Sequence, residues 1–349
     1  MADRALLVAV DTGDKGRAIE PELLELQALA HASGANVEEI VVQKRDAVDA
    51  ATLVGSGKAQ ELAEIIKEND YRLLLVLNDL RPRQRKNLEK IVPVPIVDRT
   101  MLILDVFAQH ARSREGKLQV ELAQLRYRQS NLIGTGTDLS RLGGGIGTRG
   151  PGETKLEVDR RRISARVSLL RDQLETVRRQ RETRRSAPRA EPLVALVGYT
   201  NAGKSSLLNR LARSDAYVAD KPFATLDPTM RRVWLRGAQY VRVVDTVGFI
   251  TDLPKDLINA FRATLEELNE ADLLVHVADA SNRDWPRQMQ AVDATLRDLG
   301  LENKPRLLVF NKTDAAQTPA RPGGLNVSAR TGAGIDSLRE ALAAAAAQS

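Results

Sequence analysis

The chain has 349 residues, which is long for one domain and suits two or three domains with buried cores. It contains no cysteine, which excludes disulfides, zinc–thiolate sites and thiol catalysis. The formal net charge is +6, the apolar run near the N-terminus is short, and no segment approaches the length of a membrane span, so we expect a cytoplasmic protein without a signal peptide.

Short β-rich runs alternate with helical runs over the first hundred residues. The expected strands cover residues 5–10, 36–44, 72–78 and 95–98. The expected helices cover residues 21–33, 59–69 and 81–92. Because strands separated by helices form parallel sheets, we expect a small parallel α/β domain over residues 1–99.

The next segment has a helical pattern on both sides of a glycine-rich loop. Between residues 100 and 133, leucines recur at helical spacing: Leu118, Leu122, Leu125 and Leu132. Beyond the loop, a heptad rhythm recurs: Leu156, Ile163, Val167, Leu170, Leu174 and Val177. Matching apolar seams predict an antiparallel helical hairpin over residues 100–187, with a tip loop at 134–152. The loop is either a disordered connector or a tip that becomes ordered against a partner.

Positive charge gathers in the second arm of this hairpin. Residues 155–185 contain eleven Lys or Arg and five Asp or Glu, so this segment alone has a net charge of +6. One interpretation is a solvated helix face, which is common in charge-rich helices. The other is an arm that binds a polyanion, since clustered basic side chains release counterions from phosphate backbones.

A new alternation of strands and helices begins after a linker at residues 188–192, where Pro188 and Pro192 stop the preceding helix. We expect a second α/β domain over residues 193–349, with a mostly parallel six-stranded sheet.

The sequence GYTNAGKS at residues 198–205 matches the phosphate-binding P-loop, and it lies between a strand and a helix as that motif requires. Its glycines permit the tight turn, and its backbone N–H groups receive the phosphates. Lys204 reaches the β and γ oxygens, and the Ser205 hydroxyl ligates Mg²⁺. The residues expected to bind the nucleotide here are Gly198, Tyr199, Thr200, Asn201, Ala202, Gly203, Lys204, Ser205 and Ser206.

Two later segments complete the expected phosphate and metal contacts. In DTVG, Asp245 reaches the Mg²⁺ shell and the Gly248 N–H senses the γ-phosphate. The run 219–232 is the expected first switch, in which Thr225 and Thr229 both qualify to close over Mg²⁺. We prefer Thr225, because Thr229 directly precedes a strand and would move less. The expected metal ligands are Ser205, Thr225 and Asp245, and the expected catalytic residues are Lys204, Thr225 and Gly248.

The sequences NKTD at 311–314 and VSAR at 327–330 predict that the base is guanine. Asp314 is expected to accept from the guanine N1–H and N2 amine, whereas adenine has neither donor and would leave this carboxylate unpaired and desolvated. The backbone of Ser328 and Ala329 is expected to contact guanine O6. The base-side residues are Asn311, Lys312, Asp314, Ser328, Ala329 and Arg330. The expected ligands are therefore GTP or GDP with Mg²⁺.

Phe249 occupies the position after DTVG, where Ras-like GTPases have the glutamine that orients the attacking water. A phenyl ring cannot hydrogen-bond a water. Phe249 is therefore either a packed apolar residue in a slow enzyme or part of a gated site that a partner completes.

Together these motifs resemble the translation-factor-like branch of P-loop GTPases. Residues 55–62, 98–125 and 143–157 resemble the signature of the HflX family of ribosome-associated GTPases, and the resemblance covers nearly the whole chain. It implies an N-terminal α/β domain, a helical hairpin and a GTPase domain. It also implies docking on the large (50S) ribosomal subunit and its rRNA, a role in splitting or rescuing stalled ribosomes, and slow basal hydrolysis that the ribosome stimulates. We expect a monomer.

Three further readings stay open. Asn201 is either a turn-forming residue or, as in similar P-loops, a ligand of K⁺ beside the phosphates, and turnover in KCl against NaCl distinguishes the two. The stretch LVGSGKAQE fails the P-loop pattern at Thr52 and Ala59, so a glycine turn before a helix is expected there, although the family is suggested to bind ATP in this domain. The competing functions are a signalling switch that recruits a protein effector and a GTP-independent RNA chaperone.

Overall fold

The computed structural model describes residues 3–13, 19–133, 155–185, 191–213, 222–223, 225, 228–235, 239–251, 268–315 and 320–347. The expected tip loop lies outside these residues, as do residues 219–221, 224 and 226–227 of the expected first switch. The chain forms two compact units, one of Met1–Gln109 with Leu118–Leu174 and the other of His110–Lys117 with Glu175–Ser349. Within the described ranges, no helix is both long and apolar enough to cross a membrane.

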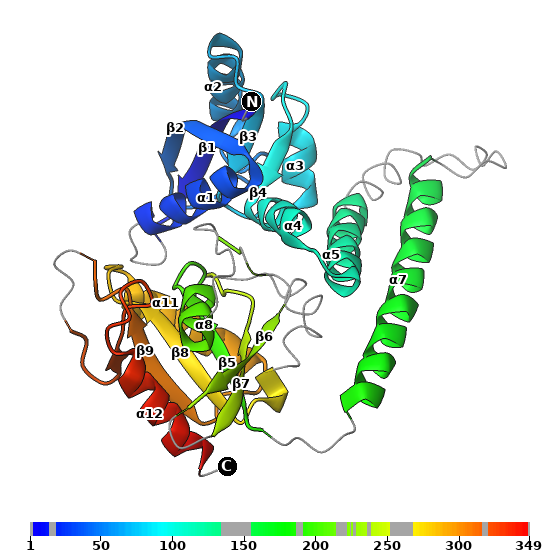
Figure 1. The fold of residues 1–349 in the computed structure, drawn as a ribbon. Helices are drawn as coiled ribbons and strands as arrows, with labels where there is room; N and C mark the ends of the chain where they lie inside the picture. The colour runs from blue at the N-terminus through cyan, green and yellow to red at the C-terminus, as the bar shows by residue number, and fades with distance from the viewer. Residues whose placement is uncertain are drawn as a thin grey trace. The chain divides into compact units, whose positions relative to one another are not determined.

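The first unit contains the expected parallel α/β layer (Figure 1). Its strands are β1 (Asp3–Asp11), β2 (Ala35–Lys44), β3 (Leu73–Val76) and β4 (Ile96–Asp98). Its helices are α1 (Glu20–Ser33), α2 (Ser56–Glu68), α3 (Pro82–Leu88), α4 (Arg99–His110), α5 (Arg114–Ile133) and the first part of α7 (Lys155–Arg185). The strands pair in parallel in the order β2-β1-β3-β4, which confirms the fold expected from their alternation with helices.

The central strand β1 holds the core of this layer. Six consecutive residues of β1 are buried, as expected of a strand covered on both faces. Leu6 and Val8 pack with Leu62 and Ile66 of α2 on one face of the sheet. Gly55, with a φ of 85°, precedes the first turn of α2, which agrees with the expected glycine turn.

The helical stretch expected from residue 100 to 133 is two helices in the structure. α4 ends at His110, and α5 begins at Arg114. Ser113 favours the new start, because its hydroxyl accepts a hydrogen bond of 2.9 Å from the backbone N–H of Gly116 and so caps the first turn of α5. The first arm of the hairpin is therefore α5 alone.

The two arms of the hairpin pack through the expected apolar seam. Leu118 and Leu122 of α5 are buried against Val167 and Leu170 of α7, and further side chains of the seam pack around them: Leu125, Ile163 and Leu174. Across the seam, Arg166 forms a two-pronged ion pair with Glu121, with the shorter bond at 2.7 Å. Glu121 of α5 bonds Arg166 of α7, whereas Gln129, later in α5, bonds the earlier Ser164 at 3.0 Å, so the arms are antiparallel, as predicted.

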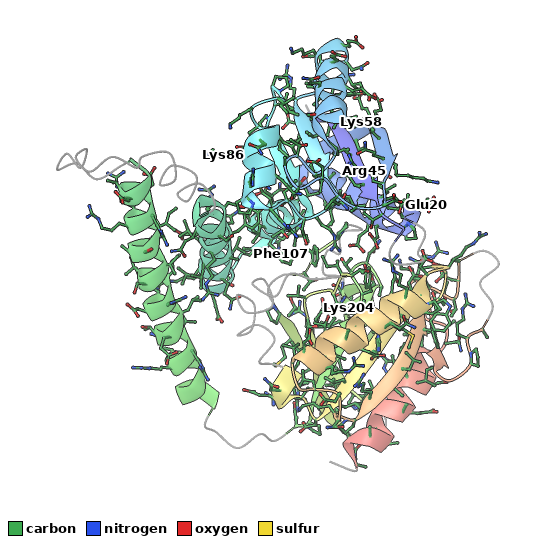
Figure 2. The ribbon with its side chains drawn as sticks, turned by 180° about the vertical axis from the view of Figure 1, so that it is seen from behind. Glu20, Arg45, Lys58, Lys86, Phe107 and Lys204 are labelled. Carbon is green, nitrogen blue, oxygen red and sulfur yellow. The ribbon has the colours of Figure 1, made fainter. Side chains whose placement is uncertain are left out.

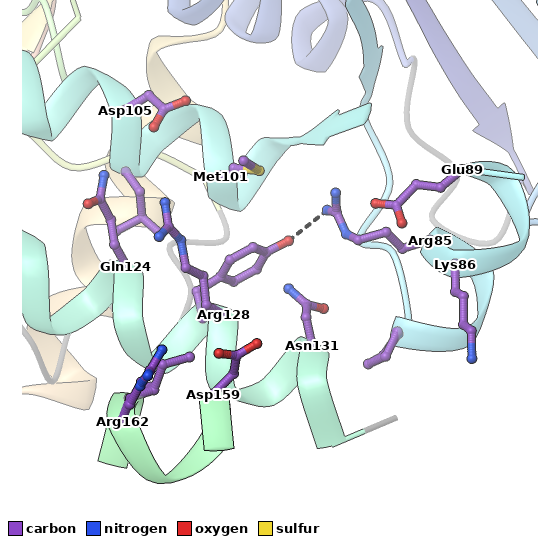
Figure 3. A pocket seen from close by; sticks show the side chains of 14 residues that line it. Arg85, Lys86, Glu89, Met101, Asp105, Gln124, Arg128, Asn131, Asp159 and Arg162 are labelled. Atoms are coloured by element: carbon purple, nitrogen blue, oxygen red, sulfur yellow. Dashed lines mark hydrogen bonds between the residues drawn. The ribbon is translucent and has the colours of Figure 1, made fainter. Parts of the chain in front are cut away.

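A buried polar network joins the hairpin to the α/β layer of the same unit. Asp98, at the end of β4, is 2% exposed. It accepts a hydrogen bond from Arg85 of α3 at 2.6 Å and another from the Tyr127 hydroxyl of α5. Burial first, and then the Asp98 charge, raise the pKa of Tyr127 far above its ordinary value. Figure 3 shows the Arg85–Tyr127 bond beside a cavity of about 590 Å³ that contains none of the expected site residues.

The second unit contains a six-stranded sheet in the order β10-β9-β8-β5-β7-β6 (Figure 1). Its strands are β5 (Leu193–Gly198), β6 (Thr229–Trp234), β7 (Tyr240–Asp245), β8 (Leu273–Asp279), β9 (Arg306–Asn311) and β10 (Leu325–Asn326). The helices among its described residues are α8 (Lys204–Ala212), α11 (Trp285–Asp298) and α12 (Ile335–Ala346). Only the β6–β7 pair is antiparallel, so the sheet is mostly parallel, as predicted.

Parallel order places the carboxyl ends of β5, β7, β8, β9 and β10 along one edge of this sheet. Apolar residues of α8 and α12 share a core cluster with alternate residues of the strands, among them Leu196, Val243 and Val275. Trp285 of α11 meets Phe310 of β9 edge to face, with ring centroids 5.1 Å apart. The packed sheet thus holds the strand ends, and the loops that follow them, in fixed positions.

We predict that the Asp98 network supports the first unit. Tyr127→Phe should lower the free energy of its unfolding by about 1–2 kcal/mol, because Asp98 loses one buried hydrogen bond. Arg85→Met should lower it by about 3–5 kcal/mol, because a buried carboxylate loses its cation. Hydrogen exchange of the β4 and α4 amides measures both changes.

The control is Tyr71→Phe, which removes a hydroxyl bonded to Glu39 at 3.1 Å and should have the smaller effect. Trp234 and Trp285, the two tryptophans of the chain, both belong to the second unit. Their fluorescence should report an unchanged transition in every variant. Equal effects of Tyr71→Phe and Tyr127→Phe would contradict the prediction.

Candidate functional site

The P-loop forms the turn between β5 and α8. Gly203, immediately before α8, has a φ of 89°, a conformation that L side chains rarely adopt. A Cβ atom at this position would also lie 2.3 Å from the Asn311 side-chain nitrogen. Asn201 has a φ of 59°, which fits its role as a turn residue. Ser206 lies in the first turn of α8.

Lys204 begins α8 and is 6% exposed (Figure 2). Its ammonium group donates to the carbonyl oxygens of Gly198 at 3.0 Å and Tyr199 at 2.9 Å. Burial lowers the pKa of Lys204 to about 8, although the nearby Asp245 charge opposes this. A partly desolvated cation inside a ring of backbone groups is well placed to attract phosphate oxygens.

Three oxygen-bearing side chains from separate segments meet beside Lys204. The Ser205 hydroxyl donates to Asp245 at 2.5 Å and lies 2.7 Å from the Thr225 hydroxyl. Thr229, the alternative to Thr225, lies in β6 in register with Asp245. The structure therefore brings Thr225, rather than Thr229, against the Ser205 hydroxyl.

Asp245 is the charged centre of this group. It is 2% exposed, and its Oδ1 is buried without a hydrogen-bond partner. Burial raises its pKa, while Lys204 and then the hydroxyls of Ser205 and Thr225 oppose the shift. A buried carboxylate with an unmet oxygen, beside two hydroxyls, is a donor set that suits Mg²⁺. The residues present therefore fit the expected metal.

The segment after β7 lies against the P-loop. A Cβ atom at Gly248 would lie 2.7 Å from the Thr200 Cα and 3.1 Å from the Lys204 ammonium, so only glycine fits this approach. Phe249 is 1% exposed, and both its backbone groups bond the P-loop, through Gly198 at 3.1 Å and Thr200 at 2.7 Å. Phe249 is thus a packed core residue.

Asn311 ties the base-side segments to the P-loop. It is 1% exposed, donates to the Ala202 carbonyl at 3.0 Å, and accepts from the Ala329 N–H at 3.0 Å. One buried amide thus fixes the P-loop, the end of β9 and the segment after β10 relative to one another.

Asp314 lies where the sequence places the guanine-reading carboxylate. It accepts a hydrogen bond of 2.6 Å from the buried Ser328 hydroxyl and pairs with Arg330, whose side chain is largely exposed. The Ser328 bond is the main cause that lowers the pKa of Asp314, and the Arg330 charge adds to it. A lowered pKa favours the ionised carboxylate, the form that accepts hydrogen bonds from N–H groups.

Sequence reasoning did not single out Asp279, which belongs to the site. It is the last residue of β8 and pairs with Lys312 at 2.7 Å. A signal exists in the sequence, because a carboxylate that ends a strand beside β9 must lie at the same sheet edge as the NKTD motif. The backbone N–H groups of Thr251 and Phe223 also bond the P-loop; Phe223 lies in the expected first switch, but the sequence assigned no contact to either residue.

Comparison with family models covers most of the chain. Residues 20–108 match the model described as GTP-binding GTPase N-terminal, and residues 110–187 match the GTP-binding GTPase middle region. Residues 193–312 match the model described as 50S ribosome-binding GTPase.

Curated relatives are similar over nearly the same length. GTPase HflX of Caldanaerobacter subterraneus subsp. tengcongensis is 48% identical over 346 residues, which span 97% of this chain and 80% of that protein. GTPase HflX of Escherichia coli K12 is 44% identical over 332 residues, which span 92% and 78%.

Two solved structures share the fold. The crystal structure of SsGBP in complex with GDP aligns with 100% of this chain and 99% of that chain, with a TM-score of 0.54 at 24% identity. A GTP-binding protein from the archaeon Sulfolobus solfataricus, also in complex with GDP, has the same coverage, with a TM-score of 0.51 at 24% identity.

We predict that Asp314→Ala weakens GDP binding about 100-fold or more, because two hydrogen bonds from guanine to a charged acceptor are lost. Asp298→Ala, which removes an exposed carboxylate near the end of α11, is the matched control and should bind normally. Isothermal titration calorimetry with GDP and ADP measures the change. A similar loss in both variants, or tight ADP binding by the unmodified chain, would contradict the assignment.

Proposed function

The chain belongs to the HflX family of GTPases, and on this premise we propose that it docks on the large (50S) ribosomal subunit and splits or rescues stalled ribosomes in a cycle of GTP binding and hydrolysis. GTP binding and hydrolysis follow from the family itself. The ribosomal partner is supported by the name of the family model that matches residues 193–312. We propose a monomer with three working parts, residues 1–99, the hairpin 100–187, and the GTPase domain 193–349 after the linker 188–192.

The phosphate end of the site accounts for nucleotide binding. We propose that Lys204 contacts the β and γ oxygens, and that the backbone N–H groups of residues 198–206 surround the phosphates. Ser205, Thr225 and Asp245 would hold Mg²⁺, which neutralises charge on the phosphate oxygens when bound. The Gly248 N–H would contact the γ-phosphate, so that both switches respond to its loss.

At the base end, Asp314 would read the guanine N1–H and N2 amine. Asn311 keeps this end in register with the P-loop, and the backbone of Ser328 and Ala329 would contact O6. Lys312, held by Asp279, would lie against the base. The K⁺ role of Asn201 stays a proposal beside its role in the turn.

Hydrolysis is proposed to be gated by the ribosome. Phe249 is buried and bonded through its backbone to the P-loop, so it offers no side-chain group to the attacking water. The side chain at this position, which is glutamine in Ras-like enzymes, therefore contributes packing and no hydrogen bond to the water. Basal GTP hydrolysis should therefore be slow. The ribosome is expected either to supply a group that orients the attacking water or to order the two switches.

The observation that carries ribosome docking is the charge on α7, a helix of 31 residues. Its described part has seven exposed arginines: Arg160, Arg161, Arg162, Arg166, Arg171, Arg178 and Arg179. Some of them pair with acidic neighbours, as Arg166 does with Glu121. An exposed arginine-rich helix is suited to the phosphate backbone of rRNA.

We predict slow intrinsic GTP hydrolysis and clear stimulation by 50S particles. Phe249→Gln should not restore a Ras-like rate, because the backbone of this residue remains bonded to the P-loop. Turnover measured with and without purified 50S particles, at saturating GTP, tests both statements. Equal rates with and without 50S particles would overturn ribosome gating, and loss of all activity in Lys204→Ala would exclude a GTP-independent RNA chaperone.

We also predict that α7 contributes salt-dependent binding. Arg160→Glu/Arg171→Glu should reduce 50S binding about tenfold or more and flatten its salt dependence between about 50 and 200 mM. Cosedimentation in a non-hydrolysable GTP analogue measures this. The control, Arg283→Glu/Arg297→Glu, makes the same charge change on exposed residues of the second unit. Salt-independent binding would instead favour a protein effector and a signalling switch.

A further inference from the structure

The segment that follows β7 is bonded to the P-loop as though it extended the sheet. Tyr199 and Phe249 form a parallel bridge. The Phe249 N–H donates to the Gly198 carbonyl at 3.1 Å, and the Thr200 N–H donates to the Phe249 carbonyl at 2.7 Å. Two backbone hydrogen bonds thus hold Phe249, at the start of the second switch, in a fixed position beside the P-loop.

A side chain adds a third anchor at this place. The Tyr199 hydroxyl accepts from the Thr251 backbone N–H at 2.9 Å and lies 2.9 Å from the Thr251 hydroxyl. Either hydroxyl can be the donor in this second contact, because each can both donate and accept. Tyr199 is 5% exposed, and its ring is therefore held by packing.

Both switches converge on the same pair of P-loop residues. The Thr200 hydroxyl accepts from the N–H of Phe223, in the described part of the first switch, at 2.9 Å. Gly248 lies so close to Thr200 that a Cβ atom would be 2.7 Å from the Thr200 Cα. A shift of residues 249–251 would therefore move Gly248 relative to Lys204 and Thr200.

We propose that Tyr199 is a positioning residue for GTP hydrolysis, acting through its hydroxyl rather than through the nucleotide. The hydroxyl holds residues 249–251 against the P-loop and so fixes the Gly248 N–H over the site of the γ-phosphate. Phe249 has no polar side-chain atom with which to anchor this segment, so the anchor comes from Tyr199 on the opposite side of the bridge. The inference rests on the nucleotide site proposed above.

Tyr199→Phe removes one oxygen atom and keeps the ring. Because the hydroxyl does not touch the nucleotide in this arrangement, KM for GTP and Kd for GDP should stay within about twofold, while kcat falls about tenfold. Exchange of the Thr251 amide with solvent should become faster. The measurements are steady-state turnover with and without 50S particles, GDP titration calorimetry, and hydrogen exchange on the full chain.

Thr251 supplies the matched pair of variants. Thr251→Ser keeps both the hydroxyl and the N–H, so its kcat should be close to that of the unmodified chain. Thr251→Val keeps only the N–H and should lie between Thr251→Ser and Tyr199→Phe. The proposal is supported if kcat falls in the order Thr251→Ser, Thr251→Val, Tyr199→Phe while KM stays constant.

Two results would overturn it. An unchanged kcat in Tyr199→Phe would show that the hydroxyl does not position the switch. A parallel loss of GDP affinity would show that Tyr199 supports nucleotide binding instead. Because basal turnover is compared between variants, failure of 50S particles to stimulate the unmodified chain would refute the ribosomal proposal alone and leave this comparison intact.

Discussion

Close backbone approach at the P-loop is the constraint on which the nucleotide site depends. Gly203 leaves no room for a Cβ atom beside Asn311, and Gly248 leaves none beside Thr200. These contacts bring the NKTD segment and the second switch directly onto the phosphate loop. The buried Asn311 amide then bonds both Ala202 and Ala329, so the P-loop, the NKTD segment and the VSAR segment are positioned by one side chain.

Electrostatics complete what the packing begins. Lys204 and Asp245 are both buried. Burial favours the neutral form of each group, so it lowers the pKa of Lys204 and raises the pKa of Asp245. Their proximity offsets part of that penalty, but Asp245 keeps an oxygen without a partner. A triphosphate with its divalent cation would meet both groups at once, the lysine with negative charge and the carboxylate with positive charge. The protein is in this sense organised for its ligand before the ligand arrives.

The first unit uses a different device to reach a fixed geometry. Asp98 gathers Arg85 from α3 and Tyr127 from α5, so the α/β layer and the hairpin are joined by a buried ion pair rather than by apolar contact alone. Such a pair is weak support for stability but strongly disfavours arrangements that separate its members. The network fixes α5 through Tyr127, near the end of the helix that leads to the tip loop, and so gives the hairpin a defined direction relative to the α/β layer.

Sequence alone determined the alternation of strands and helices, the parallel sheets, the hairpin seam, and the positions of the P-loop and NKTD motifs. Each depends on local spacing: period-two and period-3.6 patterns mark the elements, and motif residues follow strands at fixed offsets. The break between α4 and α5 was missed although Ser113 carries a local capping signal, because the apolar pattern continues past it. The contact of the Thr225 hydroxyl with Ser205, the Asp279–Lys312 pair, the Asp98 network and the Tyr199–Thr251 bonds appear only in the tertiary structure. Their partners are brought together by sheet order and packing across long stretches of chain, and no local pattern records that kind of proximity.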